Sequence, residues 1–406
     1  MKLYDTCSLL LAIDRLKECD EKFALSSVTL EEIENIKTSV HKDENSKYMA
    51  RQASKFLSEN EDRYFVIIYN MDIEELITQH KLPITNDNKI IATAASRKLN
   101  FVTNDLNARV IARQVFILQV EEEKEVEDNY CGYLEIVPTE EQLCVVYSNP
   151  AENVFNALKN QYIILFDAEG NHLDTLCWTG EENRKLNFHS FDSTWFGSVR
   201  AKKNDWYQMC AMDSLLNNQI SCLRGPAATG KSLLSMSYLF SALDRGKIDK
   251  IIVFCNPVAA RHAARLGFYP GDKNEKLLDS QIGNFLVSKL GDRGMVQDLI
   301  DQGTLLLLPF ADIRGFDTSG MRAGVYITEA QNLDIDLMKL ALQRIGEDSI
   351  CILDGDDKTQ IDMVEYSGSN NGLRKVSKVF RNHNIYGEVE LKNIYRSKIA
   401  AIANNM

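Results

Sequence analysis

The stretch Gly225-Pro226-Ala227-Ala228-Thr229-Gly230-Lys231-Ser232 fits the pattern G-x-x-x-x-G-K-[ST] of a phosphate-binding loop. Residues 219–224 before it are predicted to form a short buried strand, and residues 233–243 after it carry apolar side chains at helical spacing. The two glycines permit backbone angles that turn amide groups toward a phosphate, and the start of the helix adds a positive field. The stretch therefore predicts a P-loop in an α/β domain with a parallel sheet.

The residue types in this loop suggest separate tasks. Lys231 is expected to reach the β- and γ-phosphates, and the Ser232 hydroxyl is expected to hold Mg²⁺. A chance match in a loop that binds no nucleotide is the alternative, and the flanking strand and helix argue against it. Binding of ATP or GTP is therefore predicted, with the candidate residues Gly225, Pro226, Ala227, Ala228, Thr229, Gly230, Lys231, Ser232 and Leu233.

Composition is typical of a globular protein with two or three domains. The chain has 406 residues, of which 45% are hydrophobic and 26% charged. Its apolar runs are of strand length, and Asp5 lies where a signal peptide would need an apolar core. Nine cysteines without a C-x-x-C spacing indicate reduced thiols. We therefore expect a cytoplasmic protein without membrane contact.

The formal net charge of −12 argues against a protein that coats nucleic acid with a broad basic surface. It leaves room for a narrow basic channel. The residues that could follow a phosphate backbone there, each of which could equally be a solvated charge, are Arg261, Arg265, Lys273, Lys276, Arg314, Arg374 and Lys375.

Three segments differ in their patterns. Residues 1–120 alternate apolar runs with helical patterns, which predicts a parallel α/β sheet. Residues 121–190 open with an acidic run and continue as a small β module. Residues 191–406 hold the P-loop and repeat strand and helix, as expected for an α/β nucleotide-binding domain of the RecA-like type.

Short apolar runs mark the strands of each segment. The first segment has predicted strands at 65–69, 101–103 and 115–118. The second has them at 133–137, 143–147, 162–166 and 173–178, with the last two joined in a hairpin. The third has them, besides the strand before the P-loop, at 251–254, 304–309, 324–328, 349–354 and 388–391.

Polar side chains follow two strands of the third segment. Glu329 comes directly after the run 324–328, and acids and Gln360 follow the run 349–354. Because the carboxyl ends of parallel strands meet at one edge, an acid there can activate water beside the P-loop. An acid and a Gln after the other strand can connect the γ-phosphate to a polymer.

Residues 200–406 resemble the PhoH-type ATPases, relatives of the helicase superfamily 1 motor core. The matching pieces are 225–232, 266–272 with Glu275 and Lys276, Arg314-Gly315, 329–332, 360–362 and 394–397. The resemblance implies that Glu329 activates water. It also implies that Asp357 and Gln360 sense the γ-phosphate, and that Arg396 acts as an arginine finger. Taken alone, Arg396 could pair with a surface acid, and 266–272 could be a turn.

Asn204 and Gln208 lie where this family carries an adenine-reading pair. A Gln amide can accept a hydrogen bond from adenine N6 and donate one to N7, which favours ATP over GTP. Since the two residues are four positions apart, they could instead decorate or cap one helix.

Two positions depart from the family pattern. The family carries Asp-Glu at the end of one strand, where this chain has Thr328-Glu329, so the outer Mg²⁺ carboxylate of that pair is missing. The pattern Gly-Asp-x-x-Gln appears as Gly355-Asp356-Asp357-x-x-Gln360, so Asp356 and Asp357 compete for one role. The water-activating Glu remains, and we expect ATP hydrolysis.

Four acids of the first segment stand at predicted strand ends and helix starts, where they could share one cleft: Asp5, Glu32, Asp87 and Asp105. Clustered carboxylates repel one another unless a cation holds them, and Mg²⁺ or Mn²⁺ takes oxygen ligands. In a chain with 58 acids, helix caps and solvated charges are the alternative.

The residues around these acids, 5–10, 30–33, 87–90 and 103–105, resemble a PIN domain over about residues 1–118. The PIN family comprises Mg²⁺- or Mn²⁺-dependent ribonucleases. The resemblance implies that the four acids are catalytic metal ligands, supported by Ser8 and Thr103. Glu31 competes with Glu32, and the register of the neighbouring isoleucines favours Glu32.

A PIN domain followed by a PhoH-type domain resembles the RNA helicase and ribonuclease fusions, which tend to form hexameric rings. This resemblance implies an ATP-dependent enzyme that moves along single-stranded RNA and feeds it to a Mg²⁺- or Mn²⁺-dependent nuclease. Two alternatives stay open: a regulatory ATP-binding switch with a PIN-like interaction module, and an enzyme that acts on DNA.

Overall fold

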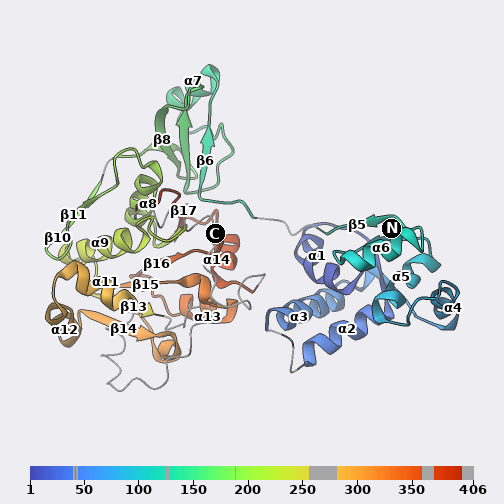
Figure 1. Ribbon diagram of the computed structural model, residues 1–406. Coiled ribbons are helices and arrows are strands. Elements are labelled where there is room, and N and C mark those ends of the chain that lie inside the picture. Colours follow the sequence, from blue (N-terminus) through green and yellow to red (C-terminus); the bar gives the residue numbers. More distant parts are fainter. Residues whose placement is uncertain are drawn as a thin grey trace. The chain divides into compact units, whose positions relative to one another are not determined.

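The computed structural model describes residues 1–39, 42, 44–123, 128–187, 189–255, 281–358 and 370–395. The chain divides into two compact units, Met1–Asn129 and Tyr130–Met406 (Figure 1). Both units are built on parallel sheets with helices, which confirms the predicted α/β class. In the described part of the chain, no helix has both the length and the apolar character needed to cross a membrane.

The first unit is a three-layer α/β/α domain. Its five parallel strands lie in the order β3-β2-β1-β4-β5. They are β1 (Lys2–Tyr4), β2 (Phe23–Ser26), β3 (Tyr64–Ile67), β4 (Asn100–Val102) and β5 (Val120–Glu121). The helices are α1 (Thr6–Glu18), α2 (Ser27–Thr38), α3 (Glu44–Glu59), α4 (Met71–Gln79), α5 (Asn86–Ser96) and α6 (Leu106–Gln114), with a 3₁₀ turn at Glu61–Arg63.

Alternating residues of these strands fill two cores. Tyr4 and Phe23 belong to one buried cluster, and their neighbours Leu3 and Ala24 belong to another. Since successive side chains of a strand point to opposite faces, each cluster lies on its own face of the sheet. The helices therefore cover both faces, as predicted.

One predicted strand of this unit is wrong. The run 115–118 is not a strand, because Val115 ends α6 and Ile117 has a left-handed φ of 53°. The edge strand β5 begins two residues after the run, at Val120. The apolar residues of the run turn the chain under the helix instead of extending it.

The second unit begins with a small four-stranded sheet in the order β6-β7-β8-β9. Its strands are β6 (Tyr133–Ile136), β7 (Gln161–Phe166), β8 (His172–Trp178) and β9 (Asn183–Lys185). β7 and β8 pair antiparallel around the turn at 167–171, which confirms the predicted hairpin.

The predicted strand 143–147 is wrong: these residues lie in helix α7 (Glu140–Ser148). Thr139 and Gln142 form a capping box, in which each side chain accepts a hydrogen bond from the other residue's backbone. This cap and the two glutamates in the first turn start a helix that outweighs the strand preference of the apolar run.

The P-loop lies in a six-stranded parallel sheet with the order β14-β13-β15-β16-β12-β17. The strands are β12 (Ile220–Arg224), β13 (Lys250–Cys255), β14 (Leu305–Pro309), β15 (Ala323–Ile327), β16 (Ile350–Gly355) and β17 (Tyr386–Glu390). All six predicted strands of the third segment are therefore present.

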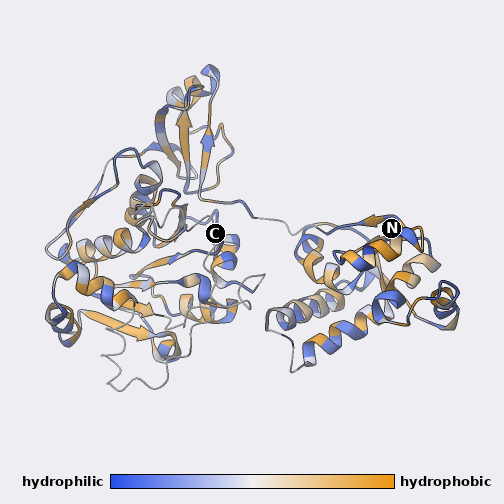
Figure 2. Cartoon of the chain, in the orientation of Figure 1, coloured by the Kyte–Doolittle hydropathy of each residue, from blue (hydrophilic) through white to orange (hydrophobic). Residues whose placement is uncertain are grey.

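Helices cover both faces of this sheet. They are α8 (Trp206–Asn217), α9 (Lys231–Asp244), α11 (Gln281–Leu290), α12 (Arg293–Asp301), α13 (Ile335–Leu342) and α14 (Gly372–Phe380). A hairpin of β10 (Ser190–Ser193) and β11 (Gly197–Arg200) precedes them, and 3₁₀ turns lie at Phe310–Gly315 and Ala330–Asn332. Ile251 and Ile252 belong to different buried clusters, so both faces carry a core. Figure 2 shows hydrophobic strands between helices of mixed character.

Candidate functional site

The P-loop joins β12 to α9 through three residues with positive φ: Gly225 (132°), Ala228 (70°) and Gly230 (100°). A Cβ at Gly225 would lie 2.2 Å from the carbonyl oxygen of Leu391, and one at Gly230 would lie 2.9 Å from Nε2 of Gln208. Both positions therefore favour glycine by their backbone angle, and at Gly225 the nearby backbone of Leu391 also leaves no room for a side chain.

Lys231 begins α9 and turns its ammonium group back into the loop. Its Nζ donates to the carbonyl oxygens of Gly225 (2.5 Å) and Pro226 (2.9 Å). Thr229 also donates to the Pro226 carbonyl oxygen, at 3.0 Å. The loop is thus closed around its lysine, which can exchange these carbonyl groups for phosphate oxygens.

Ser232, in the first turn of α9, contacts a carboxylate that the sequence analysis did not single out. Its Oγ donates to Oδ2 of Asp354 at 3.1 Å. The same oxygen accepts from the Tyr326 hydroxyl at 2.5 Å, and Oδ1 accepts from the Glu329 amide at 3.1 Å. Strand order alone explains this contact, since β16 lies directly beside β12. A hydroxyl and a carboxylate are donors that fit Mg²⁺.

Glu329 follows β15 and has a left-handed φ of 53°. Its Oε2 accepts from Nε2 of Gln331 at 2.6 Å, and Oε1 of Gln331 accepts from the Asp356 amide at 3.1 Å. The amide of Gln331 therefore connects the predicted water-activating acid to the loop after β16, which holds both candidates for the sensing role.

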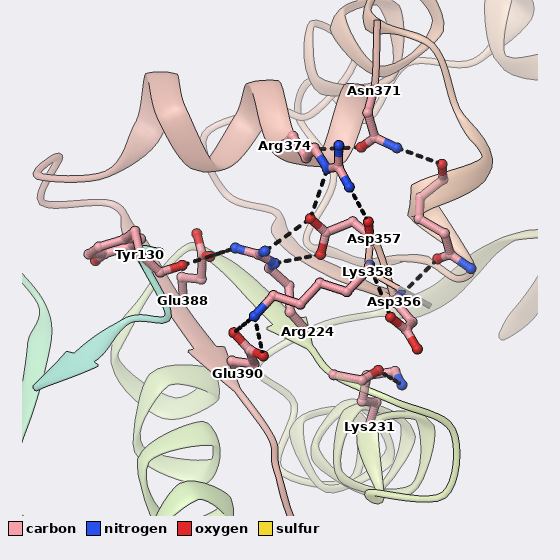
Figure 3. A network of polar contacts seen from close by, with 12 residues as sticks. Tyr130, Arg224, Lys231, Asp356, Asp357, Lys358, Asn371, Arg374, Glu388 and Glu390 are labelled. Carbon is pink, nitrogen blue, oxygen red and sulfur yellow. Dashed lines mark hydrogen bonds and ion pairs between the residues drawn. The ribbon is translucent and has the colours of Figure 1, made fainter. Parts of the chain in front are cut away.

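Asp357 lies in a buried ion-pair network (Figure 3). Oδ1 and Oδ2 each accept from the Arg224 guanidinium at 2.9 Å, and Oδ2 also accepts from Nε of Arg374 at 3.2 Å. Burial alone would raise the pKa of Asp357, but the two guanidinium groups outweigh burial and hold the pKa below its ordinary value. Arg224 also pairs with buried Glu388 at 2.6 Å.

Of the two adenine candidates, only Gln208 contacts the loop. Oε1 of Gln208 accepts from the Lys202 amide, and Nε2 donates to the carbonyl oxygen of Thr229, both at 2.9 Å. Asn204 is exposed and has a left-handed φ of 62°, just before α8. Gln208 thus contacts the P-loop directly, and the structure does not bring Asn204 to it.

Several predicted residues lie outside the described ranges: Gln360, Arg396, Arg261, Arg265, Lys273 and Lys276. Of the other basic candidates, Arg314 and Lys375 are exposed, and Arg374 belongs to the Asp357 network. Tyr395, the last residue that the structure describes, donates a hydrogen bond from its amide to the Ala228 carbonyl oxygen at 2.9 Å. The end of the described chain therefore reaches the P-loop.

In the first unit, two of the predicted acids cap helices at the carboxyl edge of the sheet. Asp5 follows β1 and accepts from the Ser8 amide at 2.6 Å, and Asp105 follows β4 and accepts from the Ala108 amide at 2.7 Å. Thr103 donates to Asp5, and Thr6 donates to Glu32. These contacts agree with a supporting role for Thr103.

Glu32 is half-buried, whereas its competitor Glu31 is exposed. Ser8 also supports the edge, because its hydroxyl accepts from the Asn104 amide at 3.0 Å. Asp87, in the first turn of α5, is exposed.

The charges of these acids affect one another. Burial raises the pKa of Asp5 above its ordinary value, against hydrogen bonds from Thr103 and Ser8, and the charge of Asp105 raises it further. Burial and the charges of Glu32, Asp105 and Asp5 raise the pKa of Asp87. Within the described ranges, however, no three acids, histidines or cysteines form a group that could already hold a metal ion. The donor chemistry fits Mg²⁺ or Mn²⁺, and the acids lie near enough for their charges to affect one another.

Comparison with known proteins finds one family match in each of the two units. The sequence profile of the PhoH-like protein family matches residues 199–406, and that of the PIN domain matches residues 3–121. The chain is 26% identical to Protein PhoH2 of Thermobispora bispora, over 88% of this chain and 86% of that protein. It is 27% identical to Protein PhoH2 of Bacillus subtilis, over 79% and 78%. A PhoH-like protein of Mycobacterium bovis is 33% identical over 40% and 45%.

Two solved structures are also similar. The structure of FitAB bound to an IR36 DNA fragment matches with 17% identity and a TM-score of 0.24, over 32% of this chain and 100% of that chain. The Sulfolobus solfataricus SWI2/SNF2 ATPase core domain matches with 13% identity and a TM-score of 0.26, over 53% and 48%.

The fold and the loop define a P-loop ATPase joined to a PIN domain. More narrowly, the chain belongs to the PhoH-like protein family.

Proposed function

We propose that this protein is an ATP-dependent RNA-processing enzyme. Its PhoH-like unit hydrolyses ATP to move along or unwind single-stranded RNA, and its PIN unit cleaves RNA with Mg²⁺ or Mn²⁺. One observation carries the proposal: each unit gathers its polar groups at the carboxyl edge of its own parallel sheet. There Glu329 and Ser232 share the carboxylate of Asp354, and Asp5 and Asp105 follow neighbouring strands.

In the ATPase unit, Lys231 binds the β- and γ-phosphates once it leaves the loop carbonyl groups. Ser232 holds Mg²⁺, which neutralises charge that develops on the phosphates. Glu329 orients the attacking water and accepts its proton, and its hydrogen bond with Gln331 fixes the carboxylate for that task.

In this proposal, three further residues couple ATP hydrolysis to movement along RNA. Asp357 and Gln360 sense the γ-phosphate, and Arg396 supplies an arginine finger within a homo-hexameric ring. Asp356 remains the competitor of Asp357. Support for sensing by this loop comes from the Gln331 side chain, which contacts both Glu329 and the Asp356 amide.

In the PIN unit, Asp5, Glu32, Asp87 and Asp105 hold the divalent ion, which activates water and stabilises the leaving oxygen when it is bound. Burial, together with the charges of neighbouring acids, raises the pKa values of Asp5 and Asp87, and a cation bound at this edge would favour their charged forms. The proposal places the enzyme in the cytoplasm.

A regulatory switch is the second candidate. The observation that favours it is Thr328, which stands where the family carries an Asp, so ATP would bind with little turnover and the PIN unit would serve as an interaction module.

A cleavage assay with labelled single-stranded RNA and DNA tests the proposal, in Mn²⁺ with and without ATP. We expect RNA cleavage by the wild type, its loss in Asp5→Asn with ATPase activity retained, and RNA-stimulated ATP hydrolysis that falls about 10²–10⁴-fold in Glu329→Gln. Lys231→Ala should lose ATP binding itself. Preferred cleavage of DNA would show that DNA is the substrate. ATP binding without RNA-stimulated turnover would favour the regulatory switch.

A further inference from the structure

Two adjacent strands of the ATPase sheet bring Thr328 and Asp354 to the same level. Ile327, the last residue of β15, pairs with Leu353 of β16, so Thr328, which follows β15, lies level with Asp354, which is still part of β16. Thr328 stands where the family carries a carboxylate. Asp354 places a carboxylate one strand closer to the P-loop, because β16 lies between β15 and β12.

The contacts of Asp354 agree with a role at the P-loop. Its side chain is 2% exposed and lies level with Leu223, the second-last residue of the P-loop strand. Oδ2 accepts from Ser232, the residue expected to hold Mg²⁺, and Oδ1 accepts from the amide of Glu329, the predicted water-activating acid. One carboxylate therefore connects both residues.

A purely structural role would be to satisfy the buried hydroxyl of Tyr326, which donates to Oδ2. That role does not require a charge. The buried carboxylate of Asp357 is balanced by Arg224 and Arg374, whereas no ion pair of Asp354 occurs among the residues that the structure describes. A buried carboxylate is costly without a positive partner, and a divalent cation at Ser232 supplies one.

We propose that Asp354 is the carboxylate that holds Mg²⁺ together with Ser232, in place of the acid that Thr328 lacks. The carboxylate thus comes from β16 instead of from the end of β15, and it lies at the P-loop. The inference rests on the ATP-hydrolysing function proposed above. If Asp354 supplies the carboxylate, Thr328 gives no reason to expect weak Mg²⁺ binding.

Equilibrium binding of a fluorescent ATP analogue, with Mg²⁺ titrated from EDTA to saturation, tests this role without any turnover. Asp354→Asn should weaken Mg²⁺ in the ternary complex about 10–100-fold and leave binding of the metal-free nucleotide unchanged. Tyr326→Phe removes a donor to the same carboxylate and should keep the Mg²⁺ dependence. The exchange variant Thr328→Asp with Asp354→Thr should recover most of the Mg²⁺ affinity, and it carries the test if Asp354→Asn does not fold.

Wild-type Mg²⁺ dependence in Asp354→Asn overturns the inference and leaves the ATPase proposal intact. A similar loss of Mg²⁺ affinity in Tyr326→Phe also overturns the inference. It would show that Asp354 acts by accepting the hydrogen bond of the Tyr326 hydroxyl. If the wild type does not bind the nucleotide at all, the proposed function fails, and this inference fails with it.

Discussion

Arg224, the last residue of the P-loop strand, forms a bidentate ion pair with Asp357 in the loop after β16, with both N···O distances at 2.9 Å. Both side chains are about 5% exposed. A third partner, Glu388 on β17, holds the other side of the guanidinium, and Arg224 also donates to the Tyr130 carbonyl oxygen at 3.1 Å. The pair therefore ties the strand before the P-loop to the predicted sensing loop and to the first residue of this unit.

We predict that Asp357→Asn destabilises the fold by about 2–3 kcal/mol at pH 7, because it removes one partner of a buried pair while Glu388 still balances Arg224. The pKa of Asp357 is lowered in the folded protein. Its stabilising contribution is therefore full above the unfolded pKa of about 3.9, and it is lost as pH falls through the folded value.

Urea unfolding at pH 7 and at pH 3 measures this effect, and the variant should lose less stability on acidification than the wild type. Asp249→Asn is the control, since Asp249 and Arg322 form a similar pair on the surface, where little stability is expected. Equal effects of the two substitutions would contradict the role of burial.

The start of the second unit approaches β17 through Gly132. A Cβ at Gly132 would lie 1.7 Å from the Glu388 carbonyl oxygen, and its φ is 84°. Gly170, in the hairpin turn, has nearly the same φ of 83° but nothing within 4 Å of the same position. Both substitutions to Ala carry the cost of a left-handed residue, about 1–2 kcal/mol.

We therefore predict that Gly170→Ala costs only that strain, whereas Gly132→Ala costs at least about 2 kcal/mol more, because the backbone of β17 cannot move away. Thermal unfolding of both variants checks the difference. Similar melting temperatures would show that the segment at Gly132 does not pack against β17 in solution.

Sequence patterns could predict the parts of this molecule that are local. The P-loop residues 225–232 and the six ATPase strands follow from apolar runs and from the chemistry of one loop. Strand order could not be predicted from them, and it is strand order that brings Asp354 to Ser232. The error at 143–147 has a different cause: a capping box outweighed the strand preference of the residues that follow it.

The acids of the PIN unit lead to a prediction about stability without metal. Because the pKa of Asp5 is raised in the folded protein, its contribution to stability is full below the unfolded pKa and is lost as pH rises through the folded value. Asp5→Asn keeps the helix cap, since Asn caps as well as Asp, and it removes a buried charge that Asp105 repels. In EDTA at pH 7 it should stabilise the protein by up to about 1 kcal/mol.

Thermal unfolding in EDTA at pH 7 and at pH 4 checks this prediction, and the difference from the wild type should shrink at the lower pH. Asp14→Asn on the exposed side of α1 is the control and should not stabilise. Added Mn²⁺ should stabilise the wild type more than Asp5→Asn. A destabilised Asp5→Asn would contradict the view that this edge is strained by its charges.

Gln208 allows a test of nucleotide choice, because its amide both fixes the P-loop and could contact a base. It donates to the Thr229 carbonyl oxygen and accepts from the Lys202 amide, so Gln208→Ala removes two hydrogen bonds of about 1 kcal/mol each. We predict about tenfold weaker ATP binding and a reduced preference for ATP over GTP.

Competition of ATP and GTP against a fluorescent analogue measures both effects in one experiment. Gln219→Ala is the matched control: Gln219 also donates through Nε2, to the carbonyl oxygens of Glu347 and Ser349, but these contacts lie before β12, at the opposite end of the strand from the P-loop. It should lower stability without changing nucleotide affinity. If Gln208→Ala weakens ATP and GTP equally, Gln208 acts on the phosphates through Thr229, and the choice of base must come from other residues.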